Sequence, residues 1–250
     1  MTGRERIAVA ASLAAGLAVW AVVAHRAGPL LLPAPDAVLA ALWSERAKLA
    51  RAAWETGVAA LGGLSVAALL GVAAAGAAWW SRVLRLALLP YTVLVQVIPI
   101  VAIAPMLLVW LGYGRGVAGV TAAIASFYPI YSATCTGLVA PSTDLVDLYR
   151  LLGASRFAEL RGLRAWAALP ALFSGLRTAG GLAVIGAIVG EFIGSNGSPP
   201  TLGYTVLHAS RSARSEVAFA AVAVAGVLSL VLSAGIGALE RRWIARWYGG

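Results

Sequence analysis

Long uncharged apolar runs dominate this 250-residue sequence and restrict it to folds that reside in a membrane. A helix needs about 20 predominantly apolar residues to cross the ~30 Å hydrocarbon core of a bilayer. A run of this kind at Leu169–Ile193 contains two charges, Arg177 and Glu191, and the others contain none. The uncharged runs are Ile7–Ala24, Thr56–Trp80, Leu86–Leu111, Val117–Ala140 and Val217–Leu239.

The predicted fold class is an all-α integral membrane protein with six transmembrane helices. Hydrophobic residues make up 61% of the chain and charged residues only 12%, whereas soluble domains carry about 25% charged residues. No stretch alternates with period 2, which disfavours a β-barrel. The first run is longer than a signal-peptide core, so we expect an uncleaved first span. Residues 1–250 are expected to form one transmembrane domain.

The distribution of basic residues predicts that both ends of the chain lie in the cytoplasm. With the N-terminus inside, eleven arginines fall in cytoplasmic segments and seven Lys or Arg residues fall outside. The formal net charge of +9 is then mostly a matter of membrane topology, and nucleic-acid binding is not indicated.

Two segments between spans are predicted to be helical without crossing the membrane. Residues 36–53 follow the rigid turn Leu32–Pro35 and have an amphipathic pattern, typical of an interfacial helix or of a plain external connector. Residues 141–166 should form a cytoplasmic elbow: a helix capped by Ser142 and ended by Gly153, then a second helix, Arg156–Arg164, capped by Ser155. A folded connector of this length suggests a docking surface.

Two of the apolar runs, Leu86–Leu111 and Leu169–Ile193, hold the candidate residues of a translocation path. Pro99 and Pro105 lie beside Gln96, and intramembrane prolines are tolerated where neighbours or a water-filled cavity satisfy the freed carbonyls. Kinked packing without a path is the alternative. Glu191 adjoins a stripe of glycines and either faces the path or reaches the outer interface.

Motifs for chemistry are missing or out of context. Gly114–Gly119 matches G-x-G-x-x-G by letters, but it lies between two predicted membrane helices and not in a βαβ unit. The chain has no P-loop motif, and His25 and His208 are isolated. We therefore expect no catalytic residue, no metal site and no cofactor bound by this chain.

Several ordered motifs resemble one transporter family. The elbow sequence Asp147–Phe157 looks like the docking loop of ABC importer permeases, and Gln96–Pro105, Phe127–Ile130 and Gly190–Glu191 are typical of their nitrate/sulfonate/taurine branch, which includes thiamine-precursor and riboflavin transporters. The hallmark Glu-Ala-Ala of the loop is Asp147-Leu148-Tyr149 here, so the fit to a typical ATPase groove is expected to be altered.

The resemblance implies a type I importer permease in the bacterial plasma (inner) membrane. Its partners would be ABC ATPase subunits that bind ATP and Mg²⁺, an extracytoplasmic solute-binding protein and a second permease copy or paralogue. The solute would be a thiamine precursor or similar heterocycle, or otherwise a nitrate-, sulfonate- or taurine-like anion. A self-sufficient secondary transporter is the alternative function. The ATPase-coupling residues implied are Asp147, Leu148, Tyr149, Arg150, Gly153, Ala154, Ser155, Arg156 and Phe157.

Overall fold

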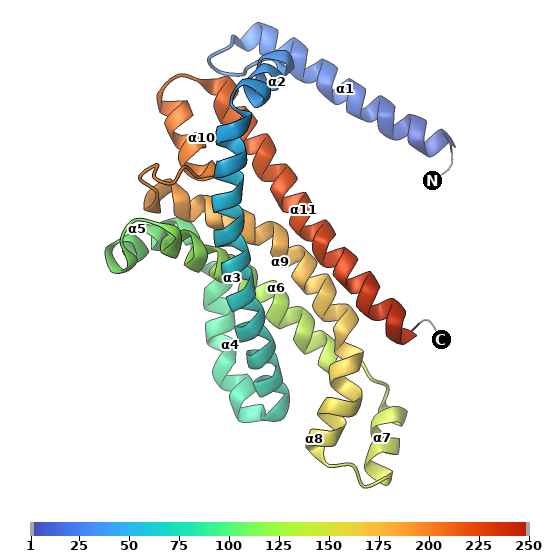
Figure 1. Cartoon of the computed structure of the whole chain (residues 1–250). Helices are drawn as coiled ribbons and strands as arrows, with labels where there is room; N and C mark the ends of the chain where they lie inside the picture. Colours follow the sequence, from blue (N-terminus) through green and yellow to red (C-terminus); the bar gives the residue numbers. More distant parts are fainter. Residues whose placement is uncertain (1–2, 249–250) are drawn as a thin grey trace.

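The computed structural model describes residues 3–248, and every regular element in that range is a helix (Figure 1). A π-helical turn, Leu160–Arg164, joins the eighth helix to the ninth. The all-α class predicted from the sequence is confirmed for this range. In chain order the helices are α1 (Gly3–Ala27), α2 (Pro35–Ser44), α3 (Arg46–Trp80), α4 (Arg82–Val97), α5 (Ile100–Leu111), α6 (Arg115–Leu138), α7 (Thr143–Leu151), α8 (Arg156–Glu159), α9 (Ala165–Gly194), α10 (Leu202–Arg211) and α11 (Ser215–Tyr248).

Five helical segments in residues 3–248 are long and apolar enough to cross a bilayer, and counting the bent pair α4 and α5 as one span gives six. The sequence predicted one kinked span over residues 86–111, but the axes of α4 and α5 differ by 99°. The break falls at Ile98 and Pro99. Proline disfavours the helical conformation of the residue before it, and Ile98 is extended, with φ −70° and ψ 122°.

The predicted interfacial helix over residues 36–53 is divided between two elements. Its first half is α2, which starts with Pro35 and ends at Ser44, with Glu45 as the C-cap. Its second half is the beginning of α3, which continues without interruption to Trp80. No proline follows Pro35 before Pro90, so nothing in the backbone stops α3 between the interface and the apolar run.

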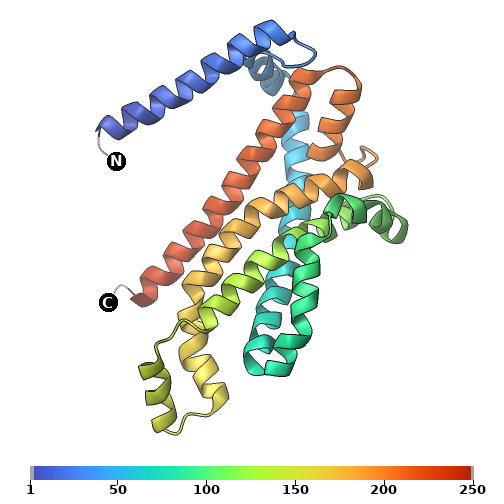
Figure 2. The same cartoon turned by 180° about the vertical axis from the view of Figure 1, so that it is seen from behind.

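The core of the molecule is made by α3, α6 and α9, which pack along one another (Figures 1 and 2). Small residues allow this close packing: a Cβ atom on Gly186 would lie 2.7 Å from the Thr121 carbonyl oxygen, and one on Gly194 would lie 2.7 Å from Val117 Cβ. The glycine stripe of α9 therefore faces α6, as close helix packing in membranes requires.

The first helix, α1, extends away from this core (Figures 1 and 2). Its C-terminal part is attached through Trp20: the indole N–H donates to the Pro33 carbonyl at 3.1 Å, and the ring stacks on Phe219. Leu13 and Leu17 are more than half exposed. In the single chain, most of this apolar helix is uncovered by protein.

Candidate coupling site and solute path

The elbow between α6 and α9 has the helix–turn–helix form expected from its capping residues. The Ser142 hydroxyl accepts a hydrogen bond from the Leu145 amide at 3.4 Å and begins α7. The Ser155 hydroxyl accepts one from the Ala158 amide at 3.2 Å and begins α8. Both serines were predicted as caps, and both satisfy amides that have no partner inside their helix.

Gly153 ends α7 in a left-handed conformation. Its φ is +75°, its amide donates to the Arg150 carbonyl, and the Ala154 amide donates to the Tyr149 carbonyl, each at 3.0 Å. This pair of bonds is the Schellman motif, which a residue without Cβ adopts at least cost. A Cβ atom at Gly153 would meet no atom within 4 Å, so only the backbone angle opposes substitution.

An ionic network holds the two arms of the elbow together. Glu159 of α8 is 5% exposed and accepts from Arg164 Nε at 2.6 Å, and Arg150 of α7 lies 3.6 Å from its other carboxylate oxygen. Arg164 also donates to the Leu138 carbonyl at the end of α6, at 2.8 Å. Because these contacts join three elements, α7 and α8 form one rigid unit with the ends of α6 and α9.

The second arm of the elbow is continuous with the long helix that follows. The sequence predicted a separate helix, Arg156–Arg164, but α8 passes through the π-helical turn directly into α9. The resulting helical segment runs from Arg156 to Gly194, 39 residues. A displacement of α8 is thereby transmitted to a helix that crosses the whole core.

The outer face of the elbow is apolar and uncovered. It lies at one extremity of the molecule (Figures 1 and 2). Leu151 is 86% exposed, and Leu148, Leu152 and Phe157 are each at least half exposed. Asp147, Arg150, Gly153, Ser155 and Arg156 are also exposed, whereas Tyr149 and Ala154 are half-buried. An apolar patch rimmed by charges is typical of a protein interaction site.

The predicted path residues of the third run lie at the break between α4 and α5. Gln96 is exposed near the end of α4 and donates to the Thr92 carbonyl at 3.5 Å. Pro99 precedes α5, and Pro105 lies inside it; both are exposed. The arrangement leaves a bent, apolar, uncovered element beside the core.

Glu191 is placed apart from these residues. It is 3% exposed, and its Oε2 accepts from Thr56 Oγ1 of α3 at 3.0 Å and from the Gly203 amide of α10 at 2.8 Å. No partner of Glu191 in residues 3–248 comes from α4 or α5. Its carboxylate joins α3, α9 and the start of α10, which is a structural role that the sequence did not suggest.

Two functional features were missed by reasoning from the sequence. Thr56 was assigned only to an apolar run, yet its hydroxyl also accepts from the Leu202 amide at 3.0 Å. Arg156 was assigned to the elbow, but its guanidinium lies over the rings of Trp79 and Trp80, 5.3 and 5.6 Å from their centroids. Arg156 and Trp79 are 77 positions apart in the sequence, and Thr56 and Leu202 are 146 apart. No local sequence pattern can predict such contacts.

Comparison with known proteins agrees with this arrangement. The family described as binding-protein-dependent transport system inner membrane component matches residues 67–245. A probable ABC transporter permease protein of Haemophilus influenzae is 34% identical over 230 residues, which cover 91% of this chain and 93% of that protein.

Two further relatives carry the names of solutes. The riboflavin transport system permease protein RibX of Chloroflexus aurantiacus is 35% identical over 166 residues, 66% of this chain and 60% of that protein. The formylaminopyrimidine transport permease protein ThiX of Halalkalibacterium halodurans is 30% identical over 182 residues, 72% of this chain and 73% of that protein. With most of the core, the elbow and α11 inside the matched region, this chain belongs to the inner-membrane permeases of binding-protein-dependent ABC transport systems.

Proposed function

We propose that this chain is the permease subunit of an ABC importer, with the elbow as its coupling element. In this proposal two copies of the chain, or one copy and a paralogue, enclose the path. Separate ATPase subunits bind ATP and Mg²⁺ and contact the elbows, and an extracytoplasmic binding protein delivers the solute. Both termini face the cytoplasm of a bacterial cell, and the chain itself binds no cofactor and catalyses no reaction.

The single observation that carries the proposal is the exposed elbow built rigidly onto α9. The apolar side chains of Leu148, Leu151 and Phe157 offer a partner an area to bury. Because α8 and α9 are one helical segment, a pull on the elbow moves α9, whose 30 residues extend about 45 Å at 1.5 Å per residue.

The far end of α9 provides the connection to the opposite side of the membrane. There Glu191 binds Thr56 of α3 and the first turn of α10. A displacement begun at the elbow would therefore reach α3 and α10 together. Binding of the delivery protein at that end and of ATP at the other would favour the same conformer, as thermodynamic linkage requires.

We propose a small nitrogen heterocycle as the solute. Riboflavin and formylaminopyrimidine, in the names of two relatives, are such compounds, and this chain is at least 30% identical to both. A taurine transport system permease protein of Escherichia coli is 28% identical over 255 residues, so a sulfonate is the second candidate.

A self-sufficient secondary transporter is the competing function. Such transporters usually show internal repeats and charges near the membrane midplane. Here Oε2 of the intramembrane Glu191 accepts hydrogen bonds from α3 and α10. A secondary transporter also gives no role to the exposed elbow.

The test is purification of the tagged full-length chain from its host, followed by uptake in reconstituted vesicles. We expect a P-loop ATPase and two permease chains in the purified complex, with uptake that needs internal ATP and resists a protonophore. The solute is identified by assaying the cognate binding protein with riboflavin, a formylaminopyrimidine and taurine. Uptake that survives without ATP and stops with the protonophore would establish the secondary transporter instead.

A further inference from the structure

A strongly basic hollow lies between the elbow and the adjoining ends of α3 and α4. Its volume is 510 Å³, within the roughly 300–1,000 Å³ range of small-molecule sites. Four arginines and one carboxylate line it, which leaves three net positive charges. The charged lining residues are Arg85, Arg150, Arg156, Arg164 and Glu159.

The protein neutralises only part of the positive charge of this hollow, and Arg150 also lies 3.7 Å from Asp147. The carboxylate of Glu159 is occupied by Arg164 and Arg150. Arg85 of α4 forms no hydrogen bond or ion pair with any residue in the described part of the chain, 3–248. Arg156 donates to the Trp79 carbonyl at 3.4 Å and otherwise stacks on tryptophans. Such guanidinium groups are well suited to bind phosphate oxygens.

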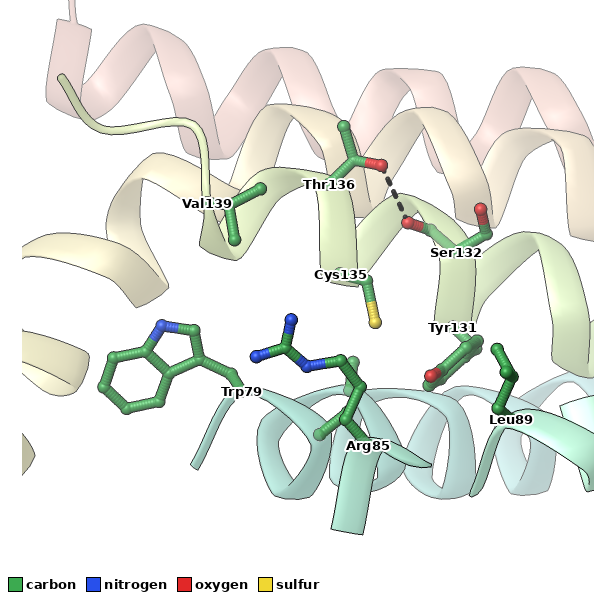
Figure 3. A pocket seen from close by; sticks show the side chains of 10 residues that line it. Trp79, Arg85, Leu89, Tyr131, Ser132, Cys135, Thr136 and Val139 are labelled. Carbon is green, nitrogen blue, oxygen red and sulfur yellow. Dashed lines mark hydrogen bonds between the residues drawn. The ribbon is translucent and has the colours of Figure 1, made fainter. Parts of the chain in front are cut away.

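An apolar cavity of 280 Å³ adjoins the hollow. It lies between the end of α3, the start of α4 and the last turns of α6, and Ala75, Leu89 and Tyr131 are among its lining residues. Trp79, Arg85 and Val139 line both cavities, so the two lie side by side. Figure 3 shows the Arg85 guanidinium between Trp79 and Cys135, at this junction.

We propose that the two cavities together bind one anionic membrane phospholipid, with its phosphate among the arginines and an acyl chain in the apolar cavity. A basic pocket between membrane helices near an interface is the kind of place where anionic headgroups bind. A soluble anion would use only the hollow and would gain nothing from the apolar cavity, so the position of the two cavities side by side favours the lipid. The bound lipid would join α4 to the elbow.

The experiment uses the full-length chain in its detergent-solubilised complex. Lipid binding is measured by native mass spectrometry and stability by thermal unfolding. The additions compared are dioleoylphosphatidylglycerol, dioleoylphosphatidylcholine and inorganic phosphate, with sodium chloride used to keep the ionic strength equal. We expect phosphatidylglycerol to be retained and to raise the unfolding temperature, and the other additions to do neither.

Two variants and one control locate the site. Arg85→Gln should weaken phosphatidylglycerol binding about tenfold, since it removes one charge-assisted phosphate contact. Arg82→Gln, an exposed arginine one turn earlier on α4 that lines neither cavity, should bind like the parent. Cys135→Phe, at a side chain that projects into the apolar cavity (Figure 3), should also lose the lipid.

Three results would overturn the proposal. The first is equal binding of the two lipids. The second is an equal loss in Arg82→Gln and Arg85→Gln. The third is stabilisation by inorganic phosphate that matches phosphatidylglycerol and persists in Cys135→Phe, because that would make the hollow a site for free anions. None of these results bears on whether the chain works with an ATPase.

Discussion

Thr56 uses one hydroxyl for two buried hydrogen bonds, one donated to Glu191 and one accepted from the Leu202 amide. The residue is completely buried, so neither bond can be replaced by water. Single side chains of this kind hold helices that are distant in the sequence. The outer end of the core depends on Thr56 more than on any apolar residue of the same size.

Thr56→Val keeps the shape of the side chain and removes both hydrogen bonds. The Leu202 amide loses its partner, and we expect a loss of about 1–2 kcal/mol in the free energy of unfolding. Thermal unfolding of the purified protein in detergent measures it. Thr56→Ser, which retains the hydroxyl, is the matched control and should be close to the parent in stability. Equal stability of the Val and Ser variants would show that the two hydrogen bonds of Thr56 do not stabilise the fold.

Gly153→Asp should reduce solute uptake without preventing insertion of the chain into the membrane. A left-handed backbone costs a residue with Cβ roughly 1–2 kcal/mol, and the carboxylate is added to the surface proposed to bind the ATPase. Gly153→Asn, uncharged and more tolerant of positive φ, should have the smaller effect. Uptake and ATPase co-purification are the measurements, and full uptake in Gly153→Asp would contradict the coupling role.

At the scale of elements, two junctions with opposite mechanical properties matter most. The junction between α4 and α5 is broken, with a 99° change of direction at Ile98 and Pro99. The junction between α8 and α9 is continuous, because the π-helical turn preserves the helix through Arg164. In the proposed importer, movement would therefore be transmitted through the second junction, and the bent pair would line the path.

Insertion of two glycines after Gly162 should separate ATP hydrolysis from uptake. The insertion interrupts the helix between elbow and core, and glycine is among the weakest helix formers. We expect the ATPase still to co-purify, and uptake to fall at least tenfold. The same insertion after Gly28, in the turn between α1 and α2, is the control and should be mild. Uptake that survives the insertion after Gly162 would show that α9 does not transmit the movement of the elbow.

At the scale of the whole molecule, the outer ends of three helices are fastened by one ionic clasp. Glu45, between α2 and α3, lies 2.9 Å from both Lys48 and Arg214, the latter in the turn before α11. The hydrogen bonds from Lys48 and then Arg214 lower the pKa of the Glu45 carboxyl below its ordinary value. The clasp therefore responds to pH in a defined direction.

Because the folded pKa of Glu45 is lowered, the stability from the clasp is present above the unfolded pKa of about 4.3 and is lost as the pH falls through the folded value. We expect the difference in unfolding temperature between the parent and Glu45→Gln to be largest at neutral pH and to shrink as the pH falls below the unfolded pKa of about 4.3. Asp36→Asn, an exposed carboxylate with no ion pair in residues 3–248, is the control. A difference that does not change with pH would exclude the clasp.

Much of the whole molecule's apolar surface remains uncovered in the single chain. The outward faces of α1 and the bent pair α4 and α5 expose large apolar side chains such as Leu13, Val97 and Val109. Lipid covers part of such a surface, and the second permease chain of the proposed importer would cover another part. These exposed apolar faces would be costly to leave in water, so we expect lipid or protein to cover them.

The features that the sequence by itself determined are local. The apolar runs, the serine caps of the elbow and the glycine that ends α7 depend on hydrogen bonds and transfer energies within a few residues. Such features can be predicted without a fold because each residue's neighbours along the chain decide them. The family resemblance, carried by motifs of the same local kind, was confirmed.

The tertiary structure alone decided which distant residues meet. Thr56 and Glu191 are 135 positions apart, and the sequence did not show that the carboxylate of Glu191 joins α3 to α10. The direction of α5 and the grouping of Arg85 with Arg156 and Trp79 belong to the same class. The packing of the helices against one another decides which of these residues meet. The pattern of residues along the sequence does not show which helix faces pack together.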